Sequence, residues 1–304
     1  MKLKQILLAS ALLLAANAGA QAADKFAVVM GNIPSANQFW ALVEKGALAK
    51  GKEVGVEVTT LGSPGGESDV AGQIALVEDL LTKGITGLAL APADPAALNP
   101  TIQKALDQGV KLVYIDRPGG VKGITYVGTD NEPAASLGAK YICDHVAKGG
   151  EVAILQGVMA IINGQARAKG SHDTLKACGM NLVAEQTAEW DNAKGQAVTE
   201  NIITAHPNLK ALFASNDNMA MGAIQALKSA KMLDQVTVVG FDGNPEAARA
   251  ILNGEMAISV AQRPYDMGAI GIESLVKLRK GETLPPVVDT GAVVVNKDNA
   301  KDYK

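Results

Sequence analysis

Short hydrophobic runs alternate with amphipathic stretches along the first half of the chain. The runs are brief, rich in aliphatic residues and followed by Gly, Pro, Asp or Asn, which is typical of strands; they cover residues 26–30, 54–60, 87–91 and 111–115. One stretch between them has apolar residues at spacings of four, three and four: Val70, Ile74, Val77 and Leu81. This spacing predicts a helix with one apolar stripe against a sheet. Strands connected by helices predict a parallel, doubly wound sheet.

The same order of elements recurs about 125 residues later. The second set of runs covers 152–156, 182–185, 211–214 and 236–240. The predicted fold class is therefore α/β, with two similar doubly wound parallel-sheet domains. Two later apolar runs, at 257–261 and 287–295, predict further strands that two domains arranged one after the other would not contain. We expect the chain to return to the first domain and cross again, so that several strands form a hinge.

These crossings define two lobes. We assign residues 23–128 and 263–289 to an N-terminal lobe, and residues 129–262 and 290–304 to a C-terminal lobe. The chain after residue 22 has about 280 residues, which is more than a single hydrophobic core usually supports, so its length agrees with two lobes.

Residues 1–22 have the pattern of a secretory signal peptide. Lys2 and Lys4 precede an apolar stretch over 6–16, and Ala20-Gln21-Ala22 has the small-residue form of a cleavage site. Polar residues and a glycine interrupt the apolar run too early for a membrane anchor. We therefore expect an exported, freely soluble mature chain.

Composition excludes several functions. Hydrophobic residues make up 48% and charged residues 19% of the chain, as in ordinary globular proteins. The net charge is −3, and removing Lys2 and Lys4 makes it −5, which does not suit a nucleic-acid partner. The three histidines are too scattered for a metal site or a catalytic triad, and the glycine-rich segment 62–66 lacks the Lys-Ser/Thr of a P-loop. We expect a plain turn there, and neither an enzyme nor a bound cofactor.

Polar and aromatic residues gather where the predicted strands end. Ligands of open α/β sheets bind beyond the carboxyl ends of the strands, so these positions are candidates for a site. The candidates are Asn37, Phe39 and Trp40 after the first strand, Asp116 and Arg117 after the fourth, Asn216 and Asp242 in the second domain, and Trp190 and Gln262.

The candidate residues share one chemistry. Asp, Asn, Gln and Arg offer paired donors or acceptors that match the hydroxyls of a sugar, and aromatic rings cover its C–H faces. Three of the six Phe and Trp residues are in this set. For each residue alone, a helix cap or a core side chain is the better explanation. The set as a whole, at the strand ends of two domains, favours a sugar-binding pocket.

The chain also resembles a known family, the periplasmic sugar-binding proteins of ABC importers, in particular the ribose- and allose-binding group. The resemblance runs from about residue 26 to 295 and rests on the motifs Asn37-Gln-Phe-Trp40, Ile115-Asp-Arg117, Asn216-Asp-Asn-Met-Ala-Met-Gly-Ala223, Val239-Gly-Phe-Asp-Gly243 and Ala261-Gln262. It implies a monomer in the periplasm whose lobes close over a monosaccharide or polyol and deliver it to the membrane permease. A same-fold receptor that signals to a chemoreceptor or sensor kinase is the alternative. A repressor core would need a helix-turn-helix in place of residues 1–22.

The resemblance also implies individual roles. Phe39 and Trp190 would stack on opposite faces of the sugar, with Trp40 beside Phe39. Hydroxyls would be bound by Asp116, Arg117, Asn216, Asp242 and Gln262. Lys169 matches the position of a sugar-facing arginine in ribose binders and Arg167 a neighbouring arginine, so which cation faces the sugar stays open.

Three departures from the family pattern argue against ribose. The first loop is longer, which leaves open whether Asn32 or Asn37 reaches the ligand. Ala91 replaces a ligand-contacting Asn of the ribose binders, and the loop 158–164 is lengthened.

Cys143 and Cys178 form no CxxC motif, and we expect them to form a disulfide. They lie near the ends of two predicted helices, 132–147 and 164–177, which the right-handed winding of the sheet brings side by side. The alternative is two buried, unpaired thiols.

Overall fold

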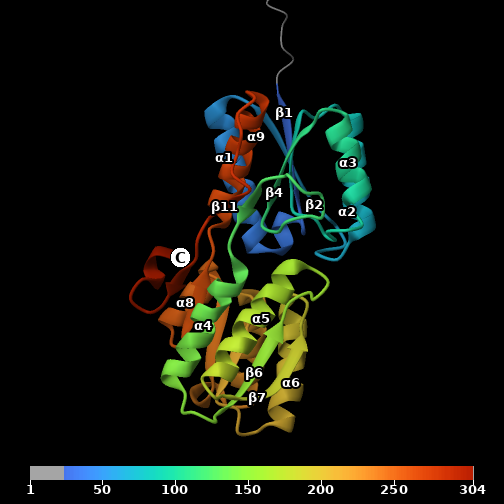
Figure 1. Cartoon of the computed structure of the whole chain (residues 1–304). Helices are drawn as coiled ribbons and strands as arrows, with labels where there is room; N and C mark the ends of the chain where they lie inside the picture. The colour runs from blue at the N-terminus through green and yellow to red at the C-terminus, as the bar shows by residue number, and fades with distance from the viewer. Residues whose placement is uncertain (1–23, 304) are drawn as a thin grey trace, which may run out of the picture.

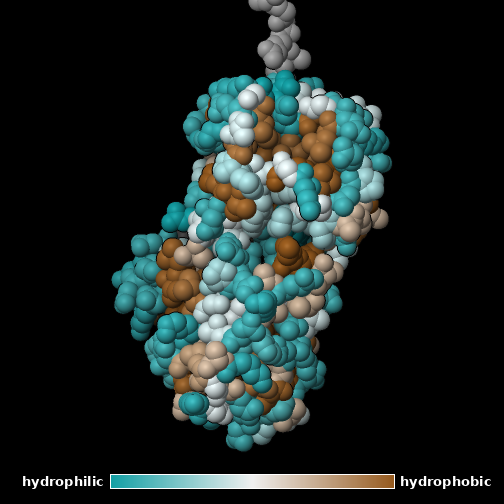
Figure 2. All heavy atoms as spheres, viewed as in Figure 1, coloured by the Kyte–Doolittle hydropathy of each residue, from teal (hydrophilic) through white to brown (hydrophobic). Residues whose placement is uncertain are grey.

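The computed structural model describes residues 24–303, so the predicted signal peptide lies outside the described residues. Two lobes are stacked end to end, each a six-stranded sheet with helices on both faces (Figure 1). The molecular surface narrows where the lobes meet (Figure 2). The predicted fold class is confirmed. Between residues 24 and 303, no helix is long and apolar enough to cross a membrane.

The first lobe is built on an all-parallel sheet with the order β11-β5-β4-β3-β1-β2. Its strands are β1 (Lys25–Met30), β2 (Glu57–Gly62), β3 (Gly87–Leu90), β4 (Lys111–Ile115), β5 (Tyr126–Gly128) and β11 (Val287–Asp289). Helices α1 (Gln38–Val54) and α9 (Pro264–Arg279) cover one face, and α2 (Val70–Thr82) and α3 (Asn99–Asp107) cover the other. The central strands are buried on both faces because helices pack on each side.

The second lobe repeats this plan with the order β12-β10-β9-β8-β6-β7, in which only β12 is antiparallel to its neighbour. Its strands are β6 (Glu151–Gln156), β7 (Asn181–Thr187), β8 (Ala211–Ala214), β9 (Thr237–Asp242), β10 (Ile258–Ala261) and β12 (Val293–Val295). Helices α4 (Asn131–His145) and α5 (Ile162–Ala177) pack on one face, and α6 (Asn192–Ala205), α7 (Asp217–Ser229) and α8 (Pro245–Leu252) on the other. Short 3₁₀ helices span Pro34–Ala36, Leu233–Gln235 and Ala300–Tyr303.

The chain passes between the two sheets three times, after β5, after β10 and between β11 and β12. As a result α9 packs beside α1, although more than 200 residues separate them in the sequence (Figure 1). The expectation that the backbone returns to the first domain is confirmed. The strands on either side of each predicted lobe boundary belong to different sheets, while the boundary residues themselves stay a prediction.

Three sequence expectations about the strands were wrong in detail. Strand β2 begins at Glu57 and not at residue 54, because α1 continues to Val54 and ends at Gly55, whose φ of +73° suits a helix terminus. The single run 287–295 forms two strands, since the chain turns through Gly291 between them. The three-residue strand β5 was missed because its length gives no periodic signal.

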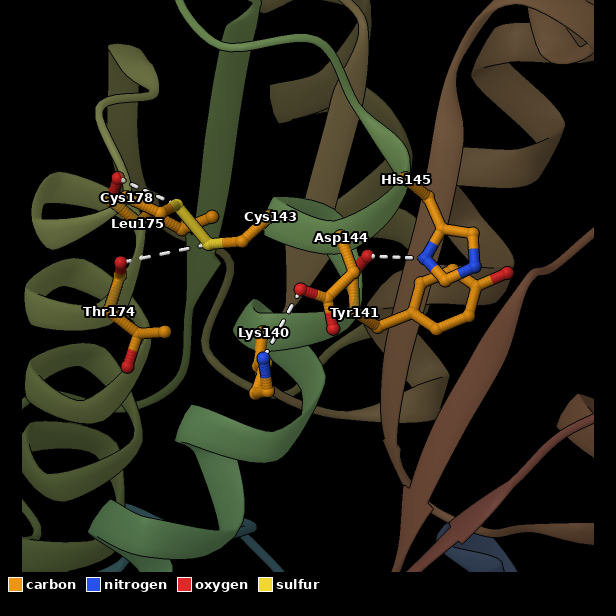
Figure 3. Close-up of a disulfide and its surroundings, with 8 residues drawn as sticks. All are labelled: Lys140, Tyr141, Cys143, Asp144, His145, Thr174, Leu175 and Cys178. Atoms are coloured by element: carbon orange, nitrogen blue, oxygen red, sulfur yellow. Dashed lines mark hydrogen bonds and ion pairs between the residues drawn. A yellow bond between two sulfur atoms is a disulfide. The ribbon is translucent and has the colours of Figure 1, made fainter.

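The predicted disulfide is present in the second lobe. Cys143, near the end of α4, and Cys178, at the end of α5, are bonded with their Cα atoms 6.0 Å apart (Figure 3). Both predicted helices exist, but α4 ends at His145, two residues before the expected end, and α5 begins at Ile162, two residues early. The bond therefore joins two parallel helices on one face of the sheet, as the winding predicts.

Candidate ligand-binding cavity

A cavity of about 330 Å³ lies between the lobes, beyond the carboxyl ends of the strands of both sheets. Both lobes contribute to its lining: Asn37, Phe39, Trp40, Glu67, Asp116, Arg117, Ile161, Asn163, Arg167, Trp190, Asn216, Asp242 and Gln262. Ten of the eleven residues proposed from the sequence are in this set, and Lys169 is not.

The aromatic part of the first-lobe wall is positioned by the start of α1. Asn37 caps this helix, and its Oδ1 accepts a hydrogen bond of 2.9 Å from the backbone N–H of Phe39. The rings of Phe39 and Trp40 meet edge to face with their centroids 5.0 Å apart. Trp40 Nε1 donates to Glu67 Oε1 at 2.5 Å, which fixes the indole ring in the wall. The capping bond explains why a polar residue stands at position 37, and it places Phe39 and Trp40 in the first turn of the helix.

Three charged side chains complete the first-lobe wall. Arg117 is almost fully buried, with Nη2 2.7 Å from Glu67 Oε2 and Nη1 3.8 Å from Asp116 Oδ2. Its guanidinium also lies 5.7 Å from the centre of the Trp40 ring. A side chain on Gly31 would collide with both Arg117 and Glu67, so glycine there leaves room for the ion pair. The wall thus presents two carboxylates and one guanidinium.

Arg167 holds the centre of the second-lobe wall. Its Nε donates to Asn131 Oδ1 at 2.7 Å, and Nη1 donates to the Ser215 carbonyl at 2.9 Å and to Asp242 Oδ1 at 3.2 Å. The guanidinium lies 5.2 Å from the centre of the Trp190 ring. Of the two cations predicted on α5, Arg167 therefore lines the cavity, and acceptors of its own lobe already hold it.

Lys169, the other cation predicted on α5, is not part of the cavity lining. Its side chain is 58% exposed and forms ion pairs with Glu132 and Asp173 on the outer surface. The physical reason is the turn of the helix. Residues two apart on α5 point about 200° apart, so Arg167 and Lys169 cannot both face the cavity.

The remaining second-lobe residues are fixed by capping and by pairing. Asn216 caps α7 by accepting from Met219 N at 2.9 Å, and its Nδ2 donates to the Trp190 carbonyl at 3.3 Å. Gln262 Nε2 donates to Asp242 Oδ1 at 2.7 Å. The Trp190 ring covers Gly157, where a Cβ atom would collide with it.

Backbone strain also concentrates at the cavity. Asp116, Trp190 and Asp242 have positive φ angles of 63°, 64° and 117°, a region that residues other than glycine seldom adopt. Such strain costs about 1 to 3 kcal/mol per residue and gathers at functional sites. Its occurrence at three residues of one cavity supports a binding role.

Burial perturbs the two cavity aspartates. It raises the pKa of Asp116 to about 6, with Arg117 opposing the shift. Burial likewise raises the pKa of Asp242 to about 6, with Arg167 and Gln262 opposing it. Behind Asp242, burial and the neighbouring carboxylate raise the pKa of Asp217, whose oxygens accept from Asn244 N and Ser259 Oγ. Donors from a ligand would stabilise the charged forms of Asp116 and Asp242.

Sequence reasoning missed three lining residues: Glu67, Ile161 and Asn163. Each follows a strand end, after β2 or β6, so the rule that located the other residues could have found them. The segment 62–66 does form turns, but the plain-turn interpretation overlooked the adjacent Glu67. Asn32 accepts from Ile33 N and does not line the cavity, whereas Asn37 does.

Comparisons with known proteins agree with this geometry. The profile of a family described as "Periplasmic binding protein domain" matches residues 26–283. The chain belongs to this family. It is 38% identical to the D-allose-binding periplasmic protein of Escherichia coli, over 87% of this chain and 88% of that protein. It is 37% identical to the D-ribose/D-allose-binding protein of Pseudomonas aeruginosa, over 85% and 83% of the two chains.

Solved structures show the same arrangement. An ABC transporter periplasmic solute-binding protein from Actinobacillus succinogenes, with bound D-allose, has a TM-score of 0.87 at 30% identity, covering 92% of this chain and all of that one. A solute-binding protein from Agrobacterium vitis, with bound D-fucose, has a TM-score of 0.86 at 30% identity, over 92% and 99% of the chains. The family is described as binding proteins, and the two solved structures are solute-binding proteins of ABC transporters, so the chain belongs to a family of binding proteins and not of enzymes.

Proposed function

We propose that the chain is the substrate-binding protein of an ABC sugar importer and that it delivers a monosaccharide or polyol to a membrane permease. The observation that carries the proposal is the cavity between the lobes, which two aspartates, two arginines and three aromatic rings line from both sides. The reported relatives are named for sugar binding, and the solved structure with bound D-allose is named for an ABC transporter, which favours transport over a signalling receptor. The protein would act as a monomer in the periplasm after removal of residues 1–22.

The ligand class follows from the donors and acceptors of the cavity. Asp116 and Asp242 accept hydrogen bonds from hydroxyls, and the guanidinium groups donate to hydroxyl and ring oxygens. Phe39 and Trp190 supply apolar surface for the C–H faces of a ring. Phe39, Asp116 and Arg117 come from the first lobe, and Trp190, Arg167 and Asp242 from the second, so a small ligand between them would hold the lobes closed.

A ligand screen tests the proposal. Purified mature chain is titrated with D-allose, D-ribose, D-fucose, myo-inositol and glycerol by calorimetry, with thermal shift and Trp fluorescence as second readouts. We expect a dissociation constant of about 1 μM or tighter, equivalent to about −8 kcal/mol, for at least one of them. A sugar phosphate, an amino acid and a dipeptide are the controls. The proposal is wrong if none of the five sugars and polyols binds, and binding of a control in their place would indicate another class of ligand.

A further inference from the structure

One side chain joins the two lobes across the cavity. Asn163, in the first turn of α5, donates through Nδ2 to the main-chain carbonyl and to Oδ1 of Asp116, both at 3.2 Å. Asp116 belongs to the first lobe and Asn163 to the second. Within residues 24–303, no other side chain forms a hydrogen bond or ion pair between the lobes outside the hinge segments.

The chemistry of Asp116 fixes the orientation of the Asn163 amide. A main-chain carbonyl can only accept, so the amide atom that faces it must be the NH₂ group and not the oxygen. The hydroxyl of Tyr126 also donates to the Asp116 carbonyl, at 2.8 Å, so the carbonyl acts as an acceptor for both side chains. Asn163 Oδ1 is therefore turned away from Asp116.

This Oδ1 atom is buried and has no hydrogen-bond partner within the described part of the chain. Asn163 is only 3% exposed and lines the cavity. A buried acceptor without a donor is costly, so closing the lobes over an empty cavity leaves this atom unsatisfied. A hydroxyl in the cavity can supply the missing donor. Closure and ligand binding then depend on the same amide.

We propose that Asn163 is a ligand-binding residue that accepts a hydrogen bond from a ligand hydroxyl through Oδ1 and holds Asp116 of the opposite lobe through Nδ2. The proposal rests on the proposed function, because it requires a polyhydroxylated ligand. The proposal also offsets an amide that this chain lacks. Ala91, which replaces a ligand-contacting Asn of the ribose binders, is buried at the end of β3 and brings no amide to the cavity. In this chain the second lobe supplies an additional amide.

Two substitutions separate the two roles. Asn163→Ala removes the acceptor and the donor together. Asn163→Asp keeps an acceptor of the same shape but loses the donor, and it places a carboxylate against the carbonyl and carboxylate of Asp116. Gln165→Ala is the matched control, since Gln165 is an exposed amide on the same helix that donates to Met159 O within its own lobe.

The experiment measures calorimetric affinity for D-allose, D-ribose, D-fucose, myo-inositol and glycerol, together with the radius of gyration in solution with and without the tightest of these. We expect Asn163→Ala to weaken that sugar about tenfold or more. Asn163→Asp should weaken it further, and at the same sugar concentration both variants should have a larger radius of gyration than wild type. Gln165→Ala should match wild type in both measurements.

The outcomes distinguish the two proposals. If wild type binds a sugar and Asn163→Ala binds it with unchanged affinity and the same radius of gyration, Asn163 is not a binding residue and the proposed function stands. If wild type binds none of the five compounds, the proposed function fails and this inference fails with it. Should Asn163→Ala not fold, the isosteric Asn163→Asp decides alone, because wild-type affinity and compactness in that variant contradict the proposal.

Discussion

Each lobe contributes an aspartate, an arginine and a tryptophan to the cavity, but the two walls are held in different ways. Asp116, Arg117 and Trp40 form the first wall, and Asp242, Arg167 and Trp190 the second. In the first wall, Arg117 depends on carboxylate partners in loops, and its Nε has no hydrogen-bond partner within residues 24–303. In the second wall, Arg167 binds a main-chain carbonyl and two side chains.

This difference indicates which wall already has its side chains held in place before a ligand binds. Arg167 bonds to a main-chain carbonyl that no side-chain substitution removes, so its position follows from the fold of the second lobe. Arg117 keeps an unused donor and depends on Glu67, which follows a turn segment. We infer that the second wall is the rigid template and that the first wall adjusts to the ligand when the lobes close.

The largest effect is expected on the stability of the second lobe when its disulfide is removed. Replacing Cys143 and Cys178 together by Ser should lower the free energy of unfolding by about 3 to 4 kcal/mol in the chain-entropy model, for a separation of 35 residues. Chemical denaturation of the purified variant measures this. Sugar affinity should stay unchanged, because the bond lies outside the cavity. Alkylation of both thiols in oxidised wild-type protein, detected by mass spectrometry, would contradict the bond.

The second test removes the aspartate of the rigid wall. Asp242→Ala leaves Arg167 and Gln262 without their shared acceptor and leaves ligand hydroxyls unpaired. Binding should weaken by about 2 to 4 kcal/mol, the upper range for a lost hydrogen bond to a charged group. Calorimetry measures the affinity, and circular dichroism checks that the variant folds. Wild-type affinity in Asp242→Ala would remove this residue from the site.

The third test uses pH to compare the aspartates. The folded protein holds the proton on Asp242 more tightly than the unfolded chain does, because its pKa rises from 3.8 to about 6. The unfolded state therefore binds fewer protons between pH 4 and 6, and the stability of the ligand-free protein should fall as pH rises through this window. We expect a loss of about 1 to 3 kcal/mol.

Asp242→Asn supplies the matched control for the pH test. The amide does not titrate, so the pH dependence should become shallower in this variant, with the contributions of Asp116 and Asp217 remaining. Thermal unfolding at closely spaced pH values measures both proteins. Equal slopes for wild type and Asp242→Asn would show that Asp242 does not titrate in this window.

The smallest expected effect concerns the first wall. Glu67→Gln keeps an acceptor for Trp40 Nε1 but removes the charge that Arg117 pairs with. Affinity for the bound sugar should fall about three- to tenfold, near 1 kcal/mol. Glu44→Gln is the control, since Glu44 accepts from Thr60 outside the cavity. A larger loss than in Asp242→Ala would reverse the assignment of the rigid and adjustable walls.

The sequence could predict much of this fold because its signals are local. Brief apolar runs, each ended by a turn residue, located most strands, and the apolar spacing of Val70, Ile74, Val77 and Leu81 located α2. The strand β5 has three residues and no such pattern, so its place beside β4 comes from the pairing of Tyr114 with Tyr126. That contact lies outside what a local window can detect.

The sequence by itself determined which residues stand at the strand ends, and the doubly wound topology requires those ends to meet at one edge of each sheet. Only the tertiary structure decided that Arg167 and not Lys169 faces the cavity, because this depends on how α5 is rotated against its sheet. It also decided that Glu67 pairs with Arg117 and that Asn163 reaches Asp116. Both contacts join segments far apart in the chain: the first depends on how two loops pack within the first lobe, and the second on how the two lobes approach each other.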